Sequence, residues 1–241
     1  MSILFELQDI HFAYPGAGEP VLDGVDCVLN EGQRMGIIGP NGCGKTSLFH
    51  VIMGLLRPQS GRVVFRGRIL DHERDFRELR REIGLLFQDA DDQLFSPTVL
   101  EDVAFGPLNL GISPAKAAQM ARATLDRLGL ADLEARVTHQ LSGGEKKLVS
   151  LATILAMQPA ALLLDEPTNN LDKATRSTLI KILAGLDLAC IIISHDWDFL
   201  SEASRDIYAM DHGRLVSCEK TILHDHHHAH PYGDHSHQHA G

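Results

Sequence analysis

The residues with the clearest chemical pattern are eight consecutive ones, Gly39-Pro40-Asn41-Gly42-Cys43-Gly44-Lys45-Thr46, with Ser47 directly after them. The run fits G-x-x-x-x-G-K-[ST], whose glycines let backbone N–H groups turn inward around a phosphate. It also opens a helical pattern, so the positive N-terminal end of a helix would face that phosphate. Lys45 is expected to place its charge between the β and γ phosphates, and Thr46 to bind Mg²⁺ through its hydroxyl. A glycine turn before an ordinary helix is the alternative, but the full pattern favours a phosphate-binding loop.

A second pattern is an apolar run, Ala160 to Leu164, that ends in two carboxylates, Asp165 and Glu166. The run is too short for a helix and is typical of a buried strand in a parallel sheet. At the carboxyl end of that strand, Asp165 is expected to hold the water shell of Mg²⁺. Glu166 would then polarise the water that attacks the γ-phosphate, as a general base does. The pattern is weak alone, but beside the phosphate-binding loop it predicts hydrolysis of a nucleotide.

The third pattern is the signature run, Leu141-Ser142-Gly143-Gly144-Glu145, which precedes a helical stretch. Ser142 and Glu145 fit a capping box, so an ordinary helix start would explain part of the run. A plain helix start needs no pair of glycines, however. Two glycines beside a capping serine leave a bare, positive surface rich in N–H donors, which suits a second phosphate contact.

From Ile3 to about Ser217, the chain resembles the ATP-binding subunits of ABC transporters, because the three patterns occur in that family's order. The resemblance implies that Glu166, His195 and Gln88 act in catalysis and that Thr46, Gln88 and Asp165 hold Mg²⁺. It assigns His195 to the γ-phosphate and implies that residues 39–47 bind ATP, with Tyr14 stacked on adenine. From the residues alone, a core or turn aromatic is the alternative for Tyr14, and a structural histidine at a strand end is the alternative for His195.

In that family, two subunits enclose two nucleotides, and the signature run of one subunit faces the phosphate-binding loop of the other. This arrangement explains how a helix N-terminus far downstream of Lys45 would contact a phosphate, since that phosphate belongs to the partner. The resemblance also implies that Asp172 makes a contact across the dimer. We therefore expect a second ATPase subunit, taken as a second copy of this chain. The copies would associate when ATP binds and separate when Glu166 hydrolyses it.

The segment from Phe87 to Val99, which continues through Glu101 to Pro107, resembles the energy-coupling-factor branch and, within it, the cobalt and nickel importers. The resemblance implies an ATPase that powers uptake of a divalent metal, nickel or cobalt. Its partners would be a membrane coupling protein and a substrate-capturing membrane protein. Leu94 and Phe95, if exposed, are expected to couple ATP hydrolysis to the membrane partner. One departure is Lys146-Lys147, where Gln-Arg or Gln-Lys is common elsewhere in the family.

Eight of the 14 histidines follow Leu223, namely His224, His226, His227, His228, His230, His235, His237 and His239. Neutral imidazole suits Ni²⁺, Co²⁺, Cu²⁺ and Zn²⁺, so this segment is expected to bind Ni²⁺ or Co²⁺ without a preformed pocket. It offers little apolar surface to offset its ordering entropy, which predicts a His-rich flexible C-terminal tail over 222–241. A spacer that binds no metal is one alternative. An expression tag is another, although its longest unbroken histidine run, 226–228, is short.

These side chains need a scaffold in which several strands end at one place. Residues 1–221 alternate short apolar runs with longer helical patterns, which is typical of an α/β fold with a mainly parallel sheet. The clearest strands are 36–38, 63–65, 161–164 and 190–194, and open α/β sheets bind ligands where their strands end. Ser113 is expected to cap a helix that begins at Pro114 and stops at Gly129. The resemblance adds a P-loop NTPase (RecA-like) core, a helical subdomain inserted at about 92–157 and an N-terminal antiparallel β region.

The composition limits the partners and the cellular location that this domain can have. In the 241-residue chain, 22 Lys and Arg against 32 Asp and Glu give a net charge of −10, which argues against nucleic acid as a partner. No apolar run approaches the roughly 20 residues needed to span a bilayer. The four cysteines lie far apart with no C-x-x-C pattern, which fits a reducing compartment. We therefore expect a soluble chain that its partners hold at the cytoplasmic face of the cell membrane.

Three other functions stay open at this point. The same machine could carry a vitamin, in which case the clustered histidines are incidental. A soluble ABC ATPase could act on ribosomes or DNA, although such proteins usually join two cassettes or insert a long coiled coil, and neither fits in 241 residues. The protein could also be chiefly a metal-binding or storage module in which ATP binding is secondary. Co-purification with membrane proteins or with ribosomes would separate transport from the soluble functions. Metal titration of the chain without its His-rich tail would identify a metal-binding module.

Overall fold

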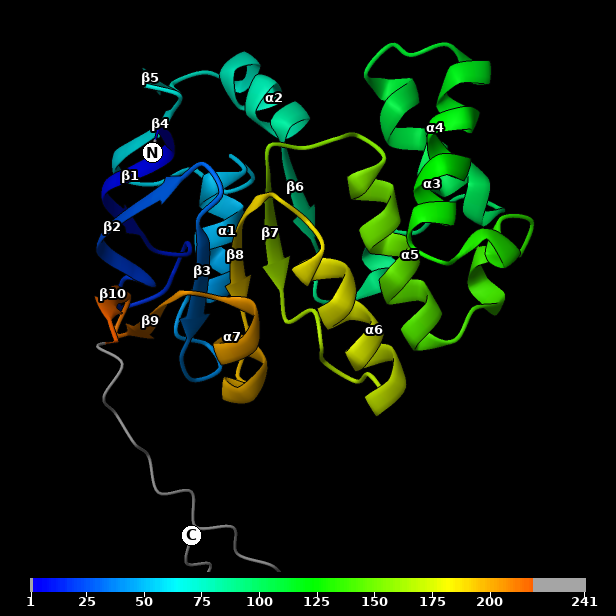
Figure 1. Cartoon of the computed structure of the whole chain (residues 1–241). Helices are drawn as coiled ribbons and strands as arrows, with labels where there is room; N and C mark the ends of the chain where they lie inside the picture. Colours follow the sequence, from blue (N-terminus) through cyan, green and yellow to red (C-terminus); the bar gives the residue numbers. More distant parts are fainter. Residues whose placement is uncertain (1, 219–241) are drawn as a thin grey trace, which may run out of the picture.

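The computed structural model describes residues 2–218, which form two β-sheets with helices packed around them (Figure 1). The larger sheet has six strands in the order β10-β9-β3-β8-β7-β6. They are β3 (Arg34–Ile38), β6 (Ile83–Leu86), β7 (Ala161–Asp165), β8 (Ala189–Ile193), β9 (Asp206–Asp211) and β10 (Arg214–Ser217). All neighbouring pairs are parallel except β9 and β10, which are antiparallel. The expected α/β fold with a mainly parallel sheet is confirmed.

Strands β7 and β8 lie inside this sheet and are buried along their whole length. Both are continuous apolar runs rather than alternating patterns, because other elements cover both faces of the sheet. On one face, Ile191 and Ile193 belong to a core that includes α1 (Lys45–Ile52) and the second sheet. On the other face, Cys190 and Ile192 belong to a core built with α5 (Gly143–Leu155), α6 (Lys173–Ala184) and α7 (Trp197–Ala203). The carboxyl ends of these strands are thereby fixed between two packed layers.

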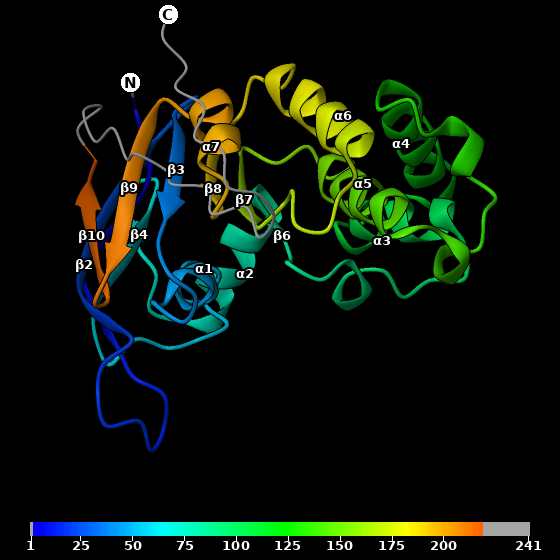
Figure 2. The same ribbon diagram turned by 90° about the horizontal axis from the view of Figure 1, so that it is seen from below.

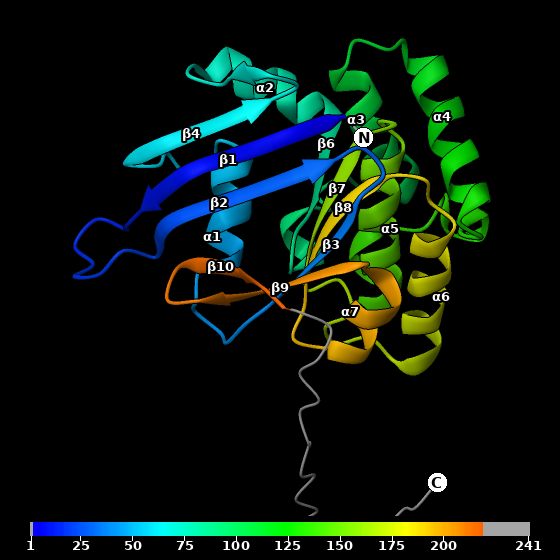
Figure 3. The ribbon, with the colours of Figure 1, turned by 60° about the vertical axis from the view of Figure 1, so that its left-hand side comes forward.

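The smaller sheet is antiparallel, in the order β2-β1-β4-β5, and covers α1 (Figure 3). Its strands are β1 (Ile3–Phe12), β2 (Leu22–Asn30), β4 (Ser60–Phe65) and β5 (Arg68–Ile69). The strand expected over 63–65 lies here, as part of β4. Arg66 and Gly67 both have positive φ, the conformation of a tight hairpin turn, and return the chain beside β4 as β5. This sheet is the N-terminal antiparallel region that the family resemblance implied.

The segment between β6 and β7 is mostly helical and lies at one end of the molecule (Figure 2). It contains α3 (Val99–Asn109), α4 (Pro114–Arg127) and α5, with short 3-10 turns at Ala90–Asp92, Ala131–Leu133 and Thr138–Gln140. Helices α3 and α4 pack on each other and on α5, and α5 also packs on β6. As expected, Ser113 directly precedes the helix that begins at Pro114, and Gly129, with a φ of 72°, follows its end. The Ser113 side chain makes no capping hydrogen bond, however, so Ser113 occupies the cap position without acting as a side-chain cap.

Helix α2 (Glu73–Glu82) leads into β6 and exposes most of its charged side chains. Within it, Glu73 pairs with Arg80 rather than with Arg77, its neighbour one turn away. No helix within residues 2–218 has both the length and the apolar character needed to cross a membrane.

Candidate active site

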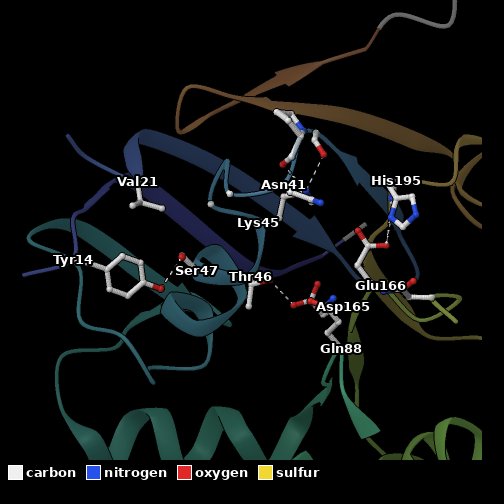
Figure 4. Close-up of a pocket in the computed structure, with 15 residues that line it drawn as sticks. Tyr14, Val21, Asn41, Lys45, Thr46, Ser47, Gln88, Asp165, Glu166 and His195 are labelled. Carbon is white, nitrogen blue, oxygen red and sulfur yellow. Dashed lines mark hydrogen bonds and ion pairs between the residues drawn. The ribbon is translucent and has the colours of Figure 1, made fainter. Parts of the chain in front are cut away.

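A cavity of about 800 Å³ lies where β3, β7 and β8 end (Figure 4). Its lining residues come from distant parts of the sequence: Tyr14, Val21, Gly39, Pro40, Asn41, Gly42, Gly44, Lys45, Thr46, Ser47, Gln88, Asp165, Glu166, Asn169 and His195. Parallel strands place their carboxyl ends at one edge of a sheet, so the loops that follow them meet there. The structure thus brings the predicted site residues to one place: the phosphate-binding loop, Asp165, Glu166, Gln88, Tyr14 and His195. Within that loop, Cys43 does not line the cavity.

The phosphate-binding loop connects β3 to α1 and needs its glycines for steric reasons. A Cβ atom at Gly39 would lie 2.5 Å from the backbone oxygen of Met210, and one at Gly44 would lie 2.7 Å from that of Val21. Gly44 also has a φ of 105° where α1 begins. Lys45 is buried, and its Nζ donates hydrogen bonds of 2.8 and 2.9 Å to the carbonyls of Gly39 and Pro40. The ammonium therefore sits within its own loop, where it would meet the oxygens of a bound phosphate.

Thr46 and Asp165 supply the oxygen atoms that Mg²⁺ prefers. The Thr46 hydroxyl donates a 2.7 Å hydrogen bond to Oδ2 of Asp165, whereas Oδ1 of Asp165 is buried and has no partner within residues 2–218. Burial raises the pKa of Asp165 above its usual value, against the opposing effect of the Thr46 hydroxyl. Hard oxygen ligands and a buried carboxylate oxygen without a hydrogen-bond partner in the described residues fit a magnesium ion. Gln88 lines the same cavity and would complete this set.

Glu166 and His195 contact each other across the ends of β7 and β8. Nδ1 of His195 lies 2.9 Å from Oε2 of Glu166, and an ionised carboxylate there makes Nδ1 the donor. The Glu166 side chain is 8% exposed, while that of His195 is 62% exposed. Glu166 has a φ of 45°, and its backbone N–H donates to the carbonyl of Ile193 at 2.9 Å. The Glu166 carboxylate is thus held beside the accessible imidazole of His195. Only Nδ1 of that ring is used in this contact, so Nε2 can bind a ligand in the cavity.

Tyr14 lies at the opposite end of the cavity from His195 (Figure 4). Its hydroxyl is 3.0 Å from Oγ of Ser47, and its ring packs edge-on against Phe12 with centroids 4.9 Å apart. Tyr14 is nonetheless 43% exposed as a residue. An anchored but accessible aromatic face suits stacking by a flat base.

Two residues that line the cavity were missed by the sequence reasoning. Val21 precedes β2, outside every recognisable pattern, and lies against Gly44 of the phosphate-binding loop. Asn169 follows Glu166 by three positions, and its backbone N–H donates to the Glu166 carbonyl at 3.1 Å. Its position directly after the Asp-Glu pair was the available signal.

The signature run does not line the cavity of its own chain; it forms the start of α5. Ser142 caps the helix, accepting from the Glu145 N–H at 3.3 Å, while Glu145 accepts from the Ser142 N–H at 2.7 Å. The capping box is therefore present. Packing against α6 also favours glycine at position 144, because a Cβ atom there would lie 2.9 Å from Oγ1 of Thr175. Leu141 is buried in the helical core, so the exposed part of the run is the helix N-terminus.

Asp172 is also placed away from the cavity, at the start of α6. Its Oδ1 accepts from the N–H groups of Ala174 and Thr175 at 2.8 and 3.0 Å, and its Oδ2 accepts from the Thr175 hydroxyl at 2.8 Å. Within one chain, Asp172 is thus a helix cap. Its predicted contact across a dimer stays a prediction.

The segment that follows Gln88 is fastened to α5 by several side chains. Lys147 is buried, and its Nζ donates to the carbonyls of Phe87 and Gln88 at 3.1 and 2.6 Å. Lys146 pairs with Asp91 at 2.5 Å. Burial lowers the pKa of Lys147, against the opposing charges of nearby carboxylates. The two lysines, which the sequence marked only as a departure, therefore join the Gln88 segment to the helix that carries the signature run.

Leu94 and Phe95 differ in exposure. Leu94 is 8% exposed and belongs to the helical core, whereas Phe95 is 66% exposed. Phe95 packs edge-on against Phe105, which is also exposed, with ring centroids 4.7 Å apart. Only Phe95 of the two residues therefore offers a surface to a partner.

The eight clustered histidines, His224 to His239, lie outside the described residues. Among residues 2–218, no group of three or more His, Cys, Asp or Glu side chains is arranged to hold a metal ion. The expectation of Ni²⁺ or Co²⁺ binding by the segment 222–241 therefore stays a prediction from its sequence.

Comparison with known proteins adds independent findings. The family model for ABC transporters matches residues 22–169. A relative from Nitratidesulfovibrio vulgaris, whose name assigns it to the ABC transporter ATP-binding proteins, is 55% identical over 98% of this chain and 86% of its own. The energy-coupling factor transporter ATP-binding protein EcfA of Methanothermobacter thermautotrophicus is 41% identical, over 89% of this chain and 70% of its own. The cobalt import ATP-binding protein CbiO of Rhodobacter capsulatus is 42% identical, over 90% and 79%.

Solved structures resemble this fold over most of its length. CbiO1 from Clostridium perfringens, part of the transporter complex CbiONQ, has a TM-score of 0.79 at 32% identity and matches 90% of this chain and 88% of its own. A dimeric ATP-binding cassette bound to ADP and phosphate has a TM-score of 0.80 at 25% identity, over 88% and 96%.

Proposed function

The chain belongs to the ABC transporter family of ATP-binding proteins, which are ATPases coupled to transport, and from this premise we propose that it powers the uptake of nickel or cobalt. The importer would be of the energy-coupling-factor type, as the relatives named EcfA and CbiO suggest. The observation that carries the proposal is the cavity in which the phosphate-binding loop, Asp165, Glu166 and His195 meet. Its chemistry is the hydrolysis of ATP to ADP and phosphate.

ATP would lie along the cavity with its base at Tyr14 and its phosphates in the loop 39–46. The exposed ring of Tyr14 provides the stacking surface, and the N-terminal end of α1 provides backbone donors for the phosphates. Lys45 would exchange its bonds to two loop carbonyls for bonds to the β and γ phosphates. A bound Mg²⁺, held by Thr46, Gln88 and Asp165, would supply positive charge against the phosphates.

Hydrolysis requires a base beside the γ-phosphate, and Glu166 is placed to serve. Its carboxylate would take the proton of the attacking water as the oxygen–phosphorus bond forms. His195 holds that carboxylate through Nδ1 at 2.9 Å and would contact the γ-phosphate through Nε2. Because positioning accounts for much of phosphoryl-transfer catalysis, the fixed backbone of Glu166 supports this role.

A second copy of the chain would complete each site. The signature run presents the donor-rich N-terminus of α5, yet it lies outside the cavity of its own chain. An arrangement in which it binds the partner's nucleotide gives those donors a ligand, and the similar cassette bound to ADP and phosphate is a dimer. ATP then acts as a reversible link between the copies, and its hydrolysis releases them.

Coupling to the membrane would pass through the segment after Gln88. Lys146 and Lys147 join this segment to α5, so movement at the γ-phosphate would displace both together. The exposed pair Phe95 and Phe105 lies just beyond and offers an apolar contact for a membrane coupling protein. That protein, with a substrate-capturing membrane protein, would hold this chain at the cytoplasmic face of the cell membrane.

Two observations favour a transition metal as the cargo: a relative is named for cobalt import, and eight histidines follow Leu223. Deleting the gene should abolish uptake of radioactive nickel or cobalt, and the wild-type gene should restore it where Glu166→Gln does not. Loss of vitamin uptake with intact metal uptake would assign the machine to a vitamin instead. Co-purification with ribosomes rather than membrane proteins would remove it from transport altogether.

A further inference from the structure

Arg176 and Asp196 form an ion pair beside the active-site cavity, although neither residue lines it. Nε and Nη2 of Arg176 lie 3.2 and 2.9 Å from the same oxygen, Oδ2 of Asp196. Their side chains are 30% and 31% exposed, so water screens the pair only in part. Arg176 lies in the first turns of α6, and Asp196 directly follows His195. The pair therefore ties helix α6 to the loop that carries the active-site histidine.

Asp196 is held by further bonds. Its Oδ1 accepts from the backbone N–H of Phe199 at 2.9 Å and so caps α7, and its own N–H donates to Oγ of Ser194 at 3.1 Å. Burial acts to raise the pKa of Asp196, but the Phe199 N–H, Arg176 and His195 outweigh it and leave the pKa below its usual value. Asp196 is thus an ionised, immobile residue next to His195, and Arg176 is the cation that balances its charge.

The charged groups around His195 come from four directions. Glu166 bonds to Nδ1 from the loop after β7, and Asp165 at the end of β7 and Lys45 on α1 line the same cavity. Asp196 is the neighbour in the chain, and Asp198 follows in α7. Arg176, from α6, acts on His195 through Asp196. If its guanidinium were removed, the Asp196 charge would act without compensation and would favour the protonated imidazole.

We propose that Arg176 is a positioning residue for ATP hydrolysis, whose ion pair with Asp196 fixes both the place and the charge environment of His195 and, through it, Glu166. The inference rests on the roles proposed above for Glu166 and His195. It also connects the helix that begins at Asp172 to the hydrolytic residues of the same chain, since Arg176 lies one turn after Asp172 and its N–H donates to the Asp172 carbonyl at 2.9 Å.

The test compares the pH dependence of ATP turnover for the full chain and its Arg176→Gln, Asp196→Asn and Arg176→Lys variants. Asn keeps an acceptor for the Phe199 N–H, so α7 stays capped. We expect kcat to fall about threefold to tenfold in Arg176→Gln with less than about a twofold change in KM for ATP, because neither side chain lines the cavity. Arg176→Lys, which keeps the charge, should recover part of this loss.

The decisive readout is the pH profile of kcat. It should move to higher pH in Arg176→Gln and to lower pH in Asp196→Asn, by roughly 0.3 to 0.5 unit each. A purely structural role would lower activity in both variants without opposite displacements, and that result would overturn the proposal. Arg176→Lys, which keeps the charge, should leave the profile unmoved. If circular dichroism shows that Arg176→Gln misfolds, the shift to lower pH in Asp196→Asn carries the test, and an unmoved profile in that variant would overturn the proposal.

Glu166→Gln in the same assay distinguishes a failure of the role proposed for Glu166 from a failure of the role proposed for Arg176. Wild-type turnover in that variant would overturn both the proposed role of Glu166 and the inference built on it. Loss of turnover in Glu166→Gln without the opposite shifts would overturn the role of Arg176 alone.

Discussion

The hydroxyl of Thr46 donates a 2.7 Å hydrogen bond to Oδ2 of Asp165, which lies 119 positions further along the chain. The other carboxylate oxygen of Asp165 is buried and has no partner within residues 2–218. Because burial raises the pKa of this group, the ionised carboxylate destabilises the protein when no cation is bound. If Asp165 binds Mg²⁺ as proposed, removing its charge should raise stability without the ion and lower activity with it.

Asp165→Asn should stabilise the nucleotide-free protein. With its pKa raised in the folded state, wild-type Asp165 contributes stability that is present below the unfolded pKa of about 3.9 and is lost as the pH rises through the folded pKa. At pH 7.5 without metal, the variant should therefore melt about 2–4 °C higher, as about 1 kcal/mol produces in a domain of this size. The difference should vanish near pH 4, and a lower melting temperature at pH 7.5 would contradict the assignment.

The same variant should lose its response to magnesium. Mg²⁺ with ATP should raise the melting temperature of the wild type but leave that of Asp165→Asn nearly unchanged, because the charged ligand is gone. Thermal scans with ATP and either Mg²⁺ or EDTA measure this directly. Equal stabilisation of both proteins by Mg²⁺ with ATP would place the ion elsewhere.

Lys147→Met should weaken the link between the Gln88 segment and α5. The change leaves the carbonyls of Phe87 and Gln88 without their buried donor and should cost about 1–3 kcal/mol in the free energy of unfolding. Nucleotide affinity should change little, because Lys147 does not line the cavity. Urea unfolding and fluorescent-nucleotide titration provide the two readouts, with Lys147→Arg as the control that keeps the charge. Unchanged stability would mean that the two hydrogen bonds contribute nothing.

Phe95→Ala should uncouple transport from ATP hydrolysis. The exposed ring is available to a membrane partner, so its removal should reduce metal uptake several-fold while basal ATPase stays within about twofold of the wild type. Leu94→Ala is the contrasting variant, since Leu94 is buried and its truncation should cost about 2–5 kcal/mol of stability instead. Loss of ATPase in Phe95→Ala to the same degree as uptake would point to a folding defect and remove the coupling role.

Truncation after Leu223 should separate metal binding from catalysis. Residues after this position carry the eight clustered histidines, so calorimetric titration should show most Ni²⁺ or Co²⁺ binding lost while ATP hydrolysis stays intact. Binding to the full chain should be weaker at pH 5.5 than at pH 7.5, because protons compete for imidazole around its unperturbed pKa of roughly 6.5. Unchanged metal binding after truncation would move the ligands into the ATPase body.

The cavity was largely predictable because its polar residues belong to short, local patterns. The loop 39–47 and the pair Asp165-Glu166 each follow a strand whose apolar run is visible in the sequence, and parallel strands bring such ends together. Gln88, Tyr14 and His195 lack patterns of this strength, and only the family resemblance singled them out.

Other features depend on contacts that no local pattern encodes. Val21 lines the cavity and lies against Gly44 of the phosphate-binding loop. Gly144 is required partly by Thr175 on a different helix. Lys147 donates to the Phe87 carbonyl 60 positions away, and Arg176 donates to Asp196 20 positions away. The spacing of apolar residues in the sequence cannot reveal such pairs. These are tertiary contacts, and they decide how the catalytic groups are held rather than which groups they are.

The proposed function, in which ATP joins two copies of this chain, assigns different tasks to Lys45 and Glu166. Lys45 would contact the phosphates in the ground state, so Lys45→Ala should abolish productive nucleotide binding. Glu166 would act on the attacking water, so Glu166→Gln should keep nucleotide affinity while turnover falls by at least about 100-fold. Only the second variant is therefore expected to accumulate in the ATP-bound form.

Size-exclusion chromatography of Glu166→Gln with ATP and Mg²⁺ tests the central claim most directly, because it reports whether ATP joins two copies of this chain. The account predicts that the variant elutes as a dimer with ATP and as a monomer with ADP, while Lys45→Ala stays monomeric with either nucleotide. A Glu166→Gln protein that binds ATP and Mg²⁺ with normal affinity yet remains monomeric would contradict it.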